Sequence, residues 1–165
     1  MVLPFLQGLV ISFSYLGLFL AGLISSSTII LPLPLYGLVF FAVGLGLNPW
    51  LASLAAGAGS ALGELTGYFL GRGGHAVIQK KYRRSKFMAG SMKFFRRFGF
   101  VTIIATAFLP FPFDFIGILS GISRYDMKKF LLATFIGKTA KILLIAYAGY
   151  VASPYVSVLM HEVGL

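Results

Sequence analysis

The sequence has no cysteine, only four acidic residues, and no charge at all before Glu64. Without cysteine the chain can form neither a disulfide framework nor a thiolate metal site. His75 and His161 stand alone, without the spacing of metal ligands, so we expect no metal and no other cofactor. A soluble chain of 165 residues cannot hide an uncharged stretch covering residues 1–63, so the solvent of this protein is expected to be mostly lipid.

What the chain does contain points the same way. Apolar residues make up 58% of the sequence and charged residues 11%, against about 25% charged in soluble proteins. The 20 glycines are typical of closely packed membrane helices. The N-terminus has no basic n-region and no A-x-A cleavage site, so we expect a retained helix there and not a signal peptide. The length allows one membrane domain, residues 1–165, with a few crossings of about 20 residues each.

We therefore predict an all-α, polytopic integral membrane protein. The expected full transmembrane helices are 3–24, 49–71 and 130–152. Two further apolar segments, 25–47 and 98–123, are each interrupted by a pair of prolines. The residues expected to break these segments are Pro32, Pro34, Pro110 and Pro112.

The block from Arg72 to Arg97 holds nine of the fourteen basic residues and no acid. Apolar residues recur there at spacings of three and four, which predicts an amphipathic interfacial segment over 74–97. By the positive-inside rule the block is expected to be cytoplasmic, with anionic lipids and not nucleic acid as its partner. The side chains expected to contact the lipid surface are Lys80, Lys81, Arg83, Arg84, Arg96 and Arg97.

The loop after segment 98–123 is also basic, with Arg124, Lys128 and Lys129 against Asp126. Both ends of this segment should therefore be cytoplasmic, which predicts a re-entrant hairpin. If segment 25–47 is a second hairpin, it opens toward the opposite side and the N-terminus is cytoplasmic. If 25–47 spans fully, the N-terminus lies outside, and no nearby charge decides between the two.

An internal repeat favours two opposed hairpins. Leu31-Pro32-Leu33-Pro34 recurs as Leu109-Pro110-Phe111-Pro112, at an offset of 78 residues. Further pairs at the same offset are Gly59 with Gly137, Gly63 with Lys141, and Gly71 with Gly149. Paired, proline-interrupted apolar segments in two halves are typical of inverted-repeat transporters with a midplane binding site.

Ionisable residues inside apolar segments are the candidates for that site. Lys138 and Lys141 lie one turn apart, and we expect them to hold a phosphate while Glu64 or Asp114 changes its protonation state. The alternatives are a purely structural pair between Glu64 and a lysine, and a helix-capping role for Asp114.

Several polar residues could complete the site. The half-helix N-termini would aim partial positive charge at an anionic group, and Ser25 to Thr28 could supply hydroxyl donors, with Ser27 and Thr28 named for the site. Tyr68 shares a helix face with Glu64. Arg72 is expected either to bind a headgroup or to anchor the chain at the interface.

Together these motifs resemble the DedA family, also called the VTT or SNARE-associated Golgi protein family. The resemblance covers about 25–150. Its pieces are the proline-broken hairpin before Gly37, the run Gly59-x-x-x-Gly63-Glu64-x-x-x-Tyr68-x-x-Gly71-Arg72, the stretch from Phe108-x-Pro110 to Gly121, and then Phe130 and Gly137. The middle motif is the most specific.

This resemblance implies two opposed re-entrant hairpins, a multi-pass location in the cell membrane and lipid transport. Family members are linked to flipping of polyprenyl phosphate carriers, to phospholipid scrambling and to dependence on the proton-motive force. Two departures suggest a divergent subgroup. Ser25 to Thr28 stand where the family has an acid, and Phe113-Asp114 stand where it has an arginine.

The leading hypothesis is a flippase or scramblase for a phosphate-bearing lipid, with protons as the candidate coupling ion. The alternatives are a proton-coupled exporter of small cations, with Glu64 and Asp114 as binding acids, and a non-transporting scaffold. The sequence has no G-x-S-x-G, H-E-x-x-H or phosphatase pattern, so we do not expect an enzyme. A homo-oligomer is compatible with the sequence.

Overall fold

The computed structural model describes residues 2–27, 35–82, 86–109 and 113–155, and side chains over 14–27, 35–74, 97–109 and 113–155. Across these ranges the chain is helical and contains no strand, as predicted. The helices are α1 (Val2–Ser27), α2 (Leu35–Gly44), α3 (Pro49–Gly63), α4 (Leu65–Tyr82), α5 (Lys86–Phe108), α6 (Asp114–Ile122) and α7 (Met127–Val151).

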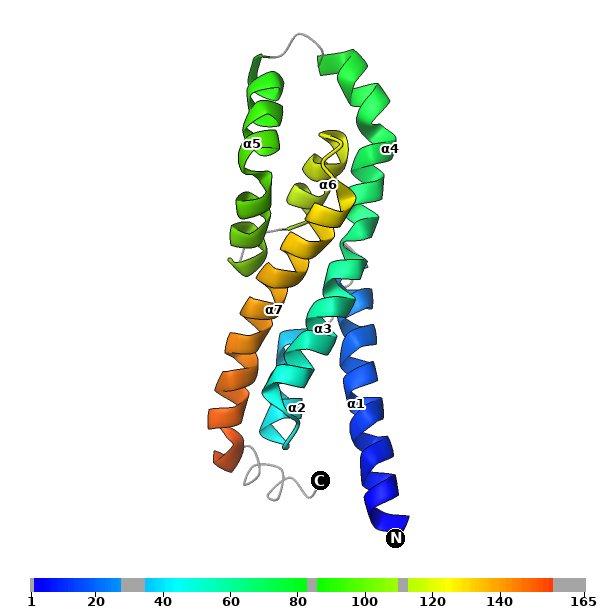
Figure 1. The fold of residues 1–165 in the computed structure, drawn as a ribbon, viewed down its shortest axis with the longest axis vertical. Coiled ribbons are helices and arrows are strands. Elements are labelled where there is room, and N and C mark those ends of the chain that lie inside the picture. The colour runs from blue at the N-terminus through cyan, green and yellow to red at the C-terminus, as the bar shows by residue number, and fades with distance from the viewer. Residues whose placement is uncertain (1, 28–34, 83–85, 110–112, 156–165) are drawn as a thin grey trace.

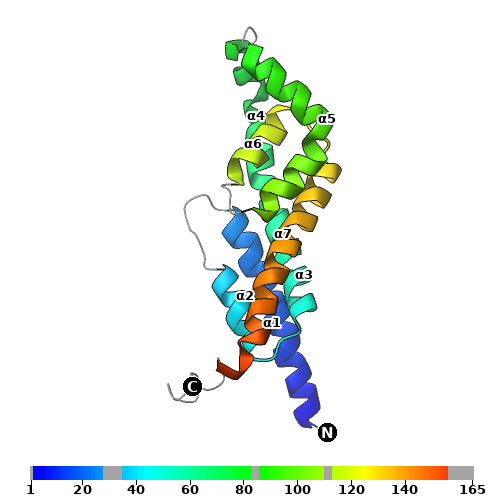
Figure 2. The same ribbon diagram turned by 90° about the vertical axis from the view of Figure 1, so that its left-hand side faces the viewer.

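The helices form an elongated bundle (Figures 1 and 2). Helices α1, α2 and α3 occupy one half of its length, and α4, α5 and α6 occupy the other. Helix α7 runs through both halves. Near the middle, α1 ends and α2 begins, and there too α5 ends and α6 begins. The middle of the bundle is therefore where the two short helices, α2 and α6, both start.

The offset of 78 residues seen in the sequence also relates the helix boundaries. Asn48 caps α3, and its side chain accepts hydrogen bonds from the N–H groups of Trp50 and Leu51. At the equivalent position Asp126 caps α7 and accepts from the N–H of Lys129. Caps of this kind fix where a helix begins, because they satisfy N–H groups that have no partner inside the helix.

The same offset relates the contacts between helices. Helix α2 packs against α7, and its counterpart α6 packs against α4. A Cβ on Gly149 would collide with the carbonyl of Phe40, and a Cβ on Gly71 with the carbonyl of Ile118. Phe40 and Ile118, like Gly71 and Gly149, are 78 residues apart. The two halves therefore repeat a close helix contact that requires glycine in the long helix.

The helix boundaries differ from those expected in two places. The predicted single helix 49–71 is two helices that meet at Glu64, and the second of them continues to Tyr82. The predicted interfacial segment 74–97 is not a separate helix, because its residues belong to the end of α4 and the start of α5. Lysine and arginine are good helix formers, so a helix can extend past the point where its apolar stretch ends.

The first proline-broken segment also begins later than expected. Helix α1 continues through Ser25 and Ser26 to Ser27, three residues beyond the predicted boundary at 24. The hydroxyl of Ser27 donates to the carbonyl of Leu23 in the last turn of this helix. The residues named as hairpin breaks (Pro32, Pro34, Pro110 and Pro112), together with Thr28, Arg83 and Arg84, lie outside the described residues.

Two apolar clusters hold the halves together. One gathers Leu18, Val39, Val43 and Ile142, and the other is built on the buried rings of Tyr68, Phe113 and Phe130. Many large apolar side chains elsewhere are exposed, including Phe115 at 68% and Val101 at 66%. Within the described residues, α7 is the one helix long and apolar enough by composition to cross a membrane.

Candidate functional site

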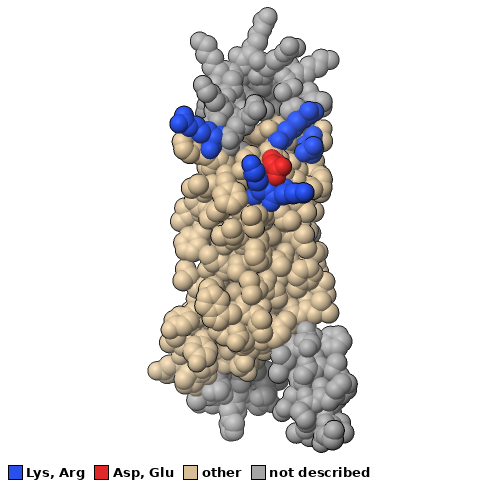
Figure 3. All heavy atoms as spheres, viewed as in Figure 1, with Lys and Arg blue, Asp and Glu red and all other residues tan. Residues whose placement is uncertain are grey.

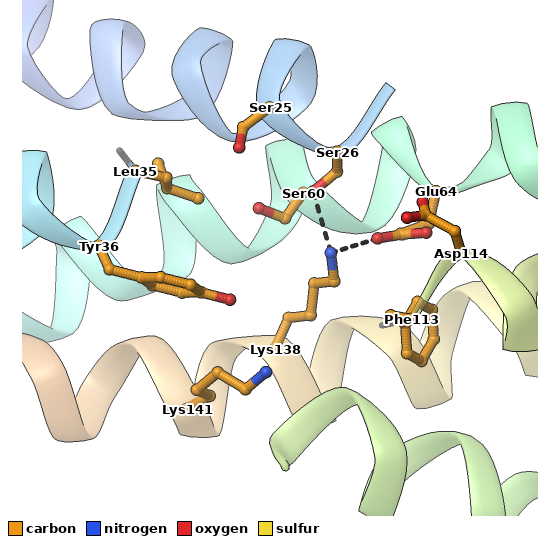
Figure 4. A pocket seen from close by; sticks show the side chains of 10 residues that line it. All are labelled: Ser25, Ser26, Leu35, Tyr36, Ser60, Glu64, Phe113, Asp114, Lys138 and Lys141. Atoms are coloured by element: carbon orange, nitrogen blue, oxygen red, sulfur yellow. Dashed lines mark hydrogen bonds and ion pairs between the residues drawn. The ribbon is translucent and has the colours of Figure 1, made fainter. Parts of the chain in front are cut away.

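A polar cavity of about 190 Å³ lies where the two halves meet (Figure 4). It receives side chains from five helices and from the residues that precede α6 and link α3 to α4. The lining residues are Ser25, Ser26, Leu35, Tyr36, Ser60, Glu64, Phe113, Asp114, Lys138 and Lys141. A cavity that gathers two acids and two lysines inside an apolar bundle is the default binding-site candidate.

Glu64 and Lys138 form a buried ion pair at the centre of this cavity. The Lys138 ammonium donates to Oε1 of Glu64 and, at 2.9 Å, to the hydroxyl of Ser26. It also lies 5.4 Å from the centroid of the Phe113 ring. Glu64 is 4% exposed and Lys138 8% exposed, so neither charge is compensated by bulk water. The two charges therefore compensate each other inside the bundle.

The local chain explains why these side chains meet. Glu64 sits at the junction of α3 and α4, where its N–H bonds to the carbonyl of Ser60 at 3.1 Å. Beside it, the hydroxyl of Thr66 donates to the carbonyls of Gly63 and Ser27. This contact ties the end of α1 to the junction, and so places the Ser26 hydroxyl within reach of Lys138.

Some polar atoms of the cavity have no protein partner. Oε2 of Glu64 and Oγ of Ser60 are buried, and neither makes a hydrogen bond within the described residues. A buried polar atom without a partner is costly, so such atoms commonly face water or a ligand. The ion pair therefore leaves one carboxylate oxygen available on the cavity side.

Lys141 is bound differently from Lys138. Its ammonium donates to the carbonyl of Leu109 at 2.8 Å and lies 5.9 Å from the ring centroid of Tyr36. No acid of the described residues forms a salt bridge with it. Lys141 therefore contributes positive charge to the cavity that no described carboxylate neutralises by direct contact.

The two short helices begin at the cavity. Leu35 and Tyr36 open α2, and Phe113 and Asp114 stand at the start of α6. The N-terminus of a helix carries partial positive charge, which favours anions nearby. Asp114 occupies the first turn of α6. No side chain caps α6 at Phe113.

The structure brings together four of the predicted site residues, namely Glu64, Asp114, Lys138 and Lys141. Ser27 is not among the lining residues, because its hydroxyl is turned back to its own helix, and the neighbouring Ser26 takes the expected role of hydroxyl partner.

Tyr68 and Arg72 also do not line the cavity. Arg72 Nη1 donates to the Tyr68 hydroxyl at 2.8 Å, and that hydroxyl donates to the carbonyl of Tyr125 at 2.5 Å. These bonds connect α4 to the turn between α6 and α7. Tyr68 is fully buried, and Arg72 is exposed.

The sequence analysis did not place Tyr36 and Phe113 in the site and did not single out Ser60 as a lining residue. The repeat contained a usable signal, because Tyr36 is the counterpart of Asp114 and Ser60 the counterpart of Lys138 at the offset of 78. Of the predicted lipid-surface residues, Arg97 is exposed, and its guanidinium carbon lies 5.4 Å from the centroid of the Phe98 ring. The backbone of Lys80 and Lys81 belongs to α4 and that of Arg96 to α5, but the side chains of these three residues are outside the described set.

Comparison with known proteins identifies the family. The VTT domain model matches residues 32–151, and the chain belongs to the VTT domain (DedA) family, as the sequence motifs predicted. An uncharacterized protein of Methanocaldococcus jannaschii, MJ0201, is 27% identical over 135 residues, covering 81% of this chain and 82% of the relative. No solved structure matches the chain. The family is membrane-associated and is linked to membrane transport or flippase-like function.

Proposed function

We propose that this protein moves a phosphate-bearing lipid, such as a polyprenyl phosphate or a phospholipid, across the cell membrane without altering it chemically. The observation that carries the proposal is the cavity between the two halves, in which Lys138, Lys141 and the N-termini of two short helices converge. Membership of a transport-associated family supports it.

The balance of charge in the cavity favours an anionic ligand. Glu64 compensates Lys138 directly, and Asp114 occupies the first turn of α6. The charge of Lys141 and the N-terminus of α2 then remain to attract an anion. The described part of the cavity thus offers an ammonium group, the N-terminus of α2 and the hydroxyl of Ser60 to phosphate oxygens.

The arrangement of the helices supports the membrane topology of the proposal. We propose a multi-pass protein with two hairpins, α1 with α2 and α5 with α6, that enter from opposite leaflets. In this proposal α1 is one arm of the first hairpin, whereas the sequence analysis expected 3–24 as a full transmembrane helix and the hairpins at 25–47 and 98–123. Irregular backbone at membrane depth is tolerated beside a polar cavity, and the cavity lies where these hairpins meet. The basic end formed by α4 and α5 is then cytoplasmic, in keeping with the positive-inside rule.

Protons are the proposed coupling ion. Glu64 has one carboxylate oxygen without a partner, and Asp114 makes no salt bridge within the described residues. Protonation of either acid would change the charge of the cavity by one unit, and protonation of Glu64 would also free Lys138 to bind phosphate. A proton gradient would then bias the direction of lipid movement.

A proton-coupled exporter of small cations is the second candidate. The presence of Glu64 and Asp114 in one cavity favours it, because two carboxylates can hold a cation. Lys141 argues against it, because its charge would repel a cationic ligand. The exporter predicts that Lys141→Gln increases transport, whereas the lipid transporter predicts a decrease.

The test is lipid translocation in proteoliposomes with labelled polyprenyl phosphate and labelled phosphatidylglycerol in parallel, with and without a pH gradient. We expect wild-type protein to move at least one of these lipids and Lys141→Gln to move it at least tenfold more slowly. Tyr68→Phe is the matched control, because it alters a buried polar group outside the cavity. Undiminished movement in a folded Glu64→Gln, Lys138→Gln, Lys141→Gln variant would overturn the proposal.

A further inference from the structure

Helix α6 ends in a turn that normally requires glycine. The N–H of Tyr125 bonds to the carbonyl of Ser120 at 2.9 Å, and the N–H of Arg124 to that of Gly121 at 3.0 Å. This pair of bonds is the Schellman motif, whose penultimate residue adopts a left-handed conformation. Here that residue is Arg124, with a φ of 51°. Among the non-glycine residues that the structure describes, Arg124 alone has a positive φ.

The other half of the molecule shows the ordinary solution. Helix α2 ends with the same two hydrogen bonds, from Gly46 to Val43 at 3.0 Å and from Leu47 to Ala42 at 3.1 Å. The left-handed residue there is Gly46, with a φ of 108°, and Arg124 is its counterpart at the offset of 78. The two turns thus share their geometry, and the arginine carries a conformational cost that the glycine does not.

Other basic residues follow this strained arginine in the chain or are linked to its turn. Arg72 is linked to the same turn through the hydroxyl of Tyr68 and the carbonyl of Tyr125, while Lys128 and Lys129 lie in the first turn of α7. All four basic side chains are exposed. Asp126 lies between them in the chain, but its carboxylate is engaged as the cap of α7.

Charged side chains are unevenly distributed over the surface of the molecule. On the face shown in Figure 3, the described lysine and arginine side chains gather near the end formed by α4 and α5, and the surface below them carries neither sign. This end also contains the basic block of residues 72–97 in the sequence. A polar, positively charged end next to an uncharged apolar band matches the boundary between a leaflet's headgroups and its hydrocarbon.

We propose that Arg124, Arg72, Lys128 and Lys129 form a docking site for anionic phospholipid headgroups at this end, separate from the central cavity. Arginine is retained at the left-handed position because its guanidinium can bind a phosphate there in bidentate fashion. The turn is rigid, so the strained backbone holds the side chain at the headgroup level. The site concerns the membrane surface and does not depend on which lipid the cavity transports.

Thermal unfolding in neutral detergent tests the proposal, because it reports strain and binding together. Replacing arginine by glycine relieves the strain, so Arg124→Gly should raise the unfolding temperature by about 2–4 °C without added lipid. Titration with short-chain phosphatidylglycerol should stabilise the wild type, since a ligand that binds the folded state raises its stability. The variant should bind this lipid about fivefold more weakly, the loss expected for one basic contact.

Three controls sharpen the result. Arg124→Lys should keep most of the lipid effect, and Gly46→Ala should lower stability without changing the lipid effect. The Arg124→Gly effect should persist in a Lys141→Gln background, which separates this site from the cavity. Arg124→Asn, whose side chain tolerates the left-handed conformation, serves if the glycine variant is poorly folded.

Four results would overturn the proposal. They are an unchanged lipid response in Arg124→Gly, a lower unfolding temperature of that variant in neutral detergent, an equal response to short-chain phosphatidylcholine, and an equal response to inorganic phosphate. The second would show that the arginine stabilises the turn, and the last would assign the site to free phosphate.

Discussion

Glu64 and Lys138 form an ion pair that joins the two halves of the molecule, since Glu64 belongs to the first repeat and Lys138 to the second. Both side chains are buried, and Ser26 completes the contact from the end of α1. The pair therefore has two consequences. It neutralises charge at the centre of an apolar bundle, and it connects three helices around the candidate site.

Removing one partner of this pair should be worse for stability than removing both. Glu64→Leu leaves the Lys138 ammonium buried without its counter-charge, and we expect a loss of about 3 kcal/mol in the free energy of unfolding. The double variant Glu64→Leu, Lys138→Met removes both charges and should recover most of that loss. Chemical unfolding of the wild type, Glu64→Leu, Lys138→Met and the double variant in detergent measures the coupling, and additive effects would show that the pair contributes little.

Replacing either Gly71 or Gly149 by alanine should cause a similar packing defect. Gly71→Ala and Gly149→Ala each force a Cβ against a backbone carbonyl, of Ile118 and Phe40 respectively, and should each destabilise the fold by about 1–3 kcal/mol. Gly73→Ala in α4 is the matched control, because a Cβ there meets no atom within 4 Å. This control should be neutral or slightly stabilising. The midpoints of chemical unfolding in detergent measure these changes. An unchanged midpoint for Gly71→Ala would contradict the close contact between Gly71 and Ile118.

The caps Asn48 and Asp126 should contribute similar amounts to the free energy of unfolding. Asn48→Ala and Asp126→Ala each remove a side chain that accepts from first-turn N–H groups, and each should cost about 1 kcal/mol of stability. Asn48→Asp and Asp126→Asn preserve the acceptor and should restore most of the loss. Thermal unfolding of the four variants provides the measurement. If the capping substitutes are as unstable as the alanines, the caps do not act through these hydrogen bonds.

Tyr68→Phe should separate structural from transport effects. The variant keeps the ring, whose centroid lies 5.2 Å from that of Phe130, but loses the bonds to Arg72 and Tyr125. We expect a loss of about 1 kcal/mol in stability and unchanged lipid movement, because this hydroxyl lies outside the cavity. Unfolding and translocation are measured on the same preparation. Tenfold slower transport by stable protein would place Tyr68 in the transport path.

Sequence reasoning predicted the helical class, the family and the offset of the repeat. It also selected the four charged residues of the cavity, because ionisable residues in apolar sequence are few and their cost makes them conspicuous. It could not choose between Ser26 and Ser27, since neighbouring serines differ only in the direction that the helix gives them. The sequence also placed the end of the helix after Glu64 at residue 71, whereas α4 continues to Tyr82. The prediction used the end of the apolar stretch as the end of the helix, but basic residues are also good helix formers.

The number of membrane crossings differs between the sequence prediction and the described helices. Hydropathy predicts several crossings, whereas by length and composition the described helices supply one, α7, together with the shorter apolar stretches Ser14–Ser27, Leu35–Gly44 and Arg97–Phe108. Short apolar helices are what paired hairpins would contain, so the proposed topology depends on these pieces acting in pairs. Cysteine accessibility at engineered positions in α2 and α6, tested from each side of the membrane, would show which leaflet each hairpin enters.

The repeat of the backbone is not a repeat of the charges. The counterpart of Glu64 is Ile142, and the counterpart of Lys138 is Ser60, so exchanging the roles of the two halves would not restore the ion pair. In an inverted-repeat transporter, the inward-facing and outward-facing states arise when the two repeats exchange conformations. Because the charges are not repeated, these two states would differ in energy. The resting protein should favour one of them, and the cavity should open by preference to one side of the membrane.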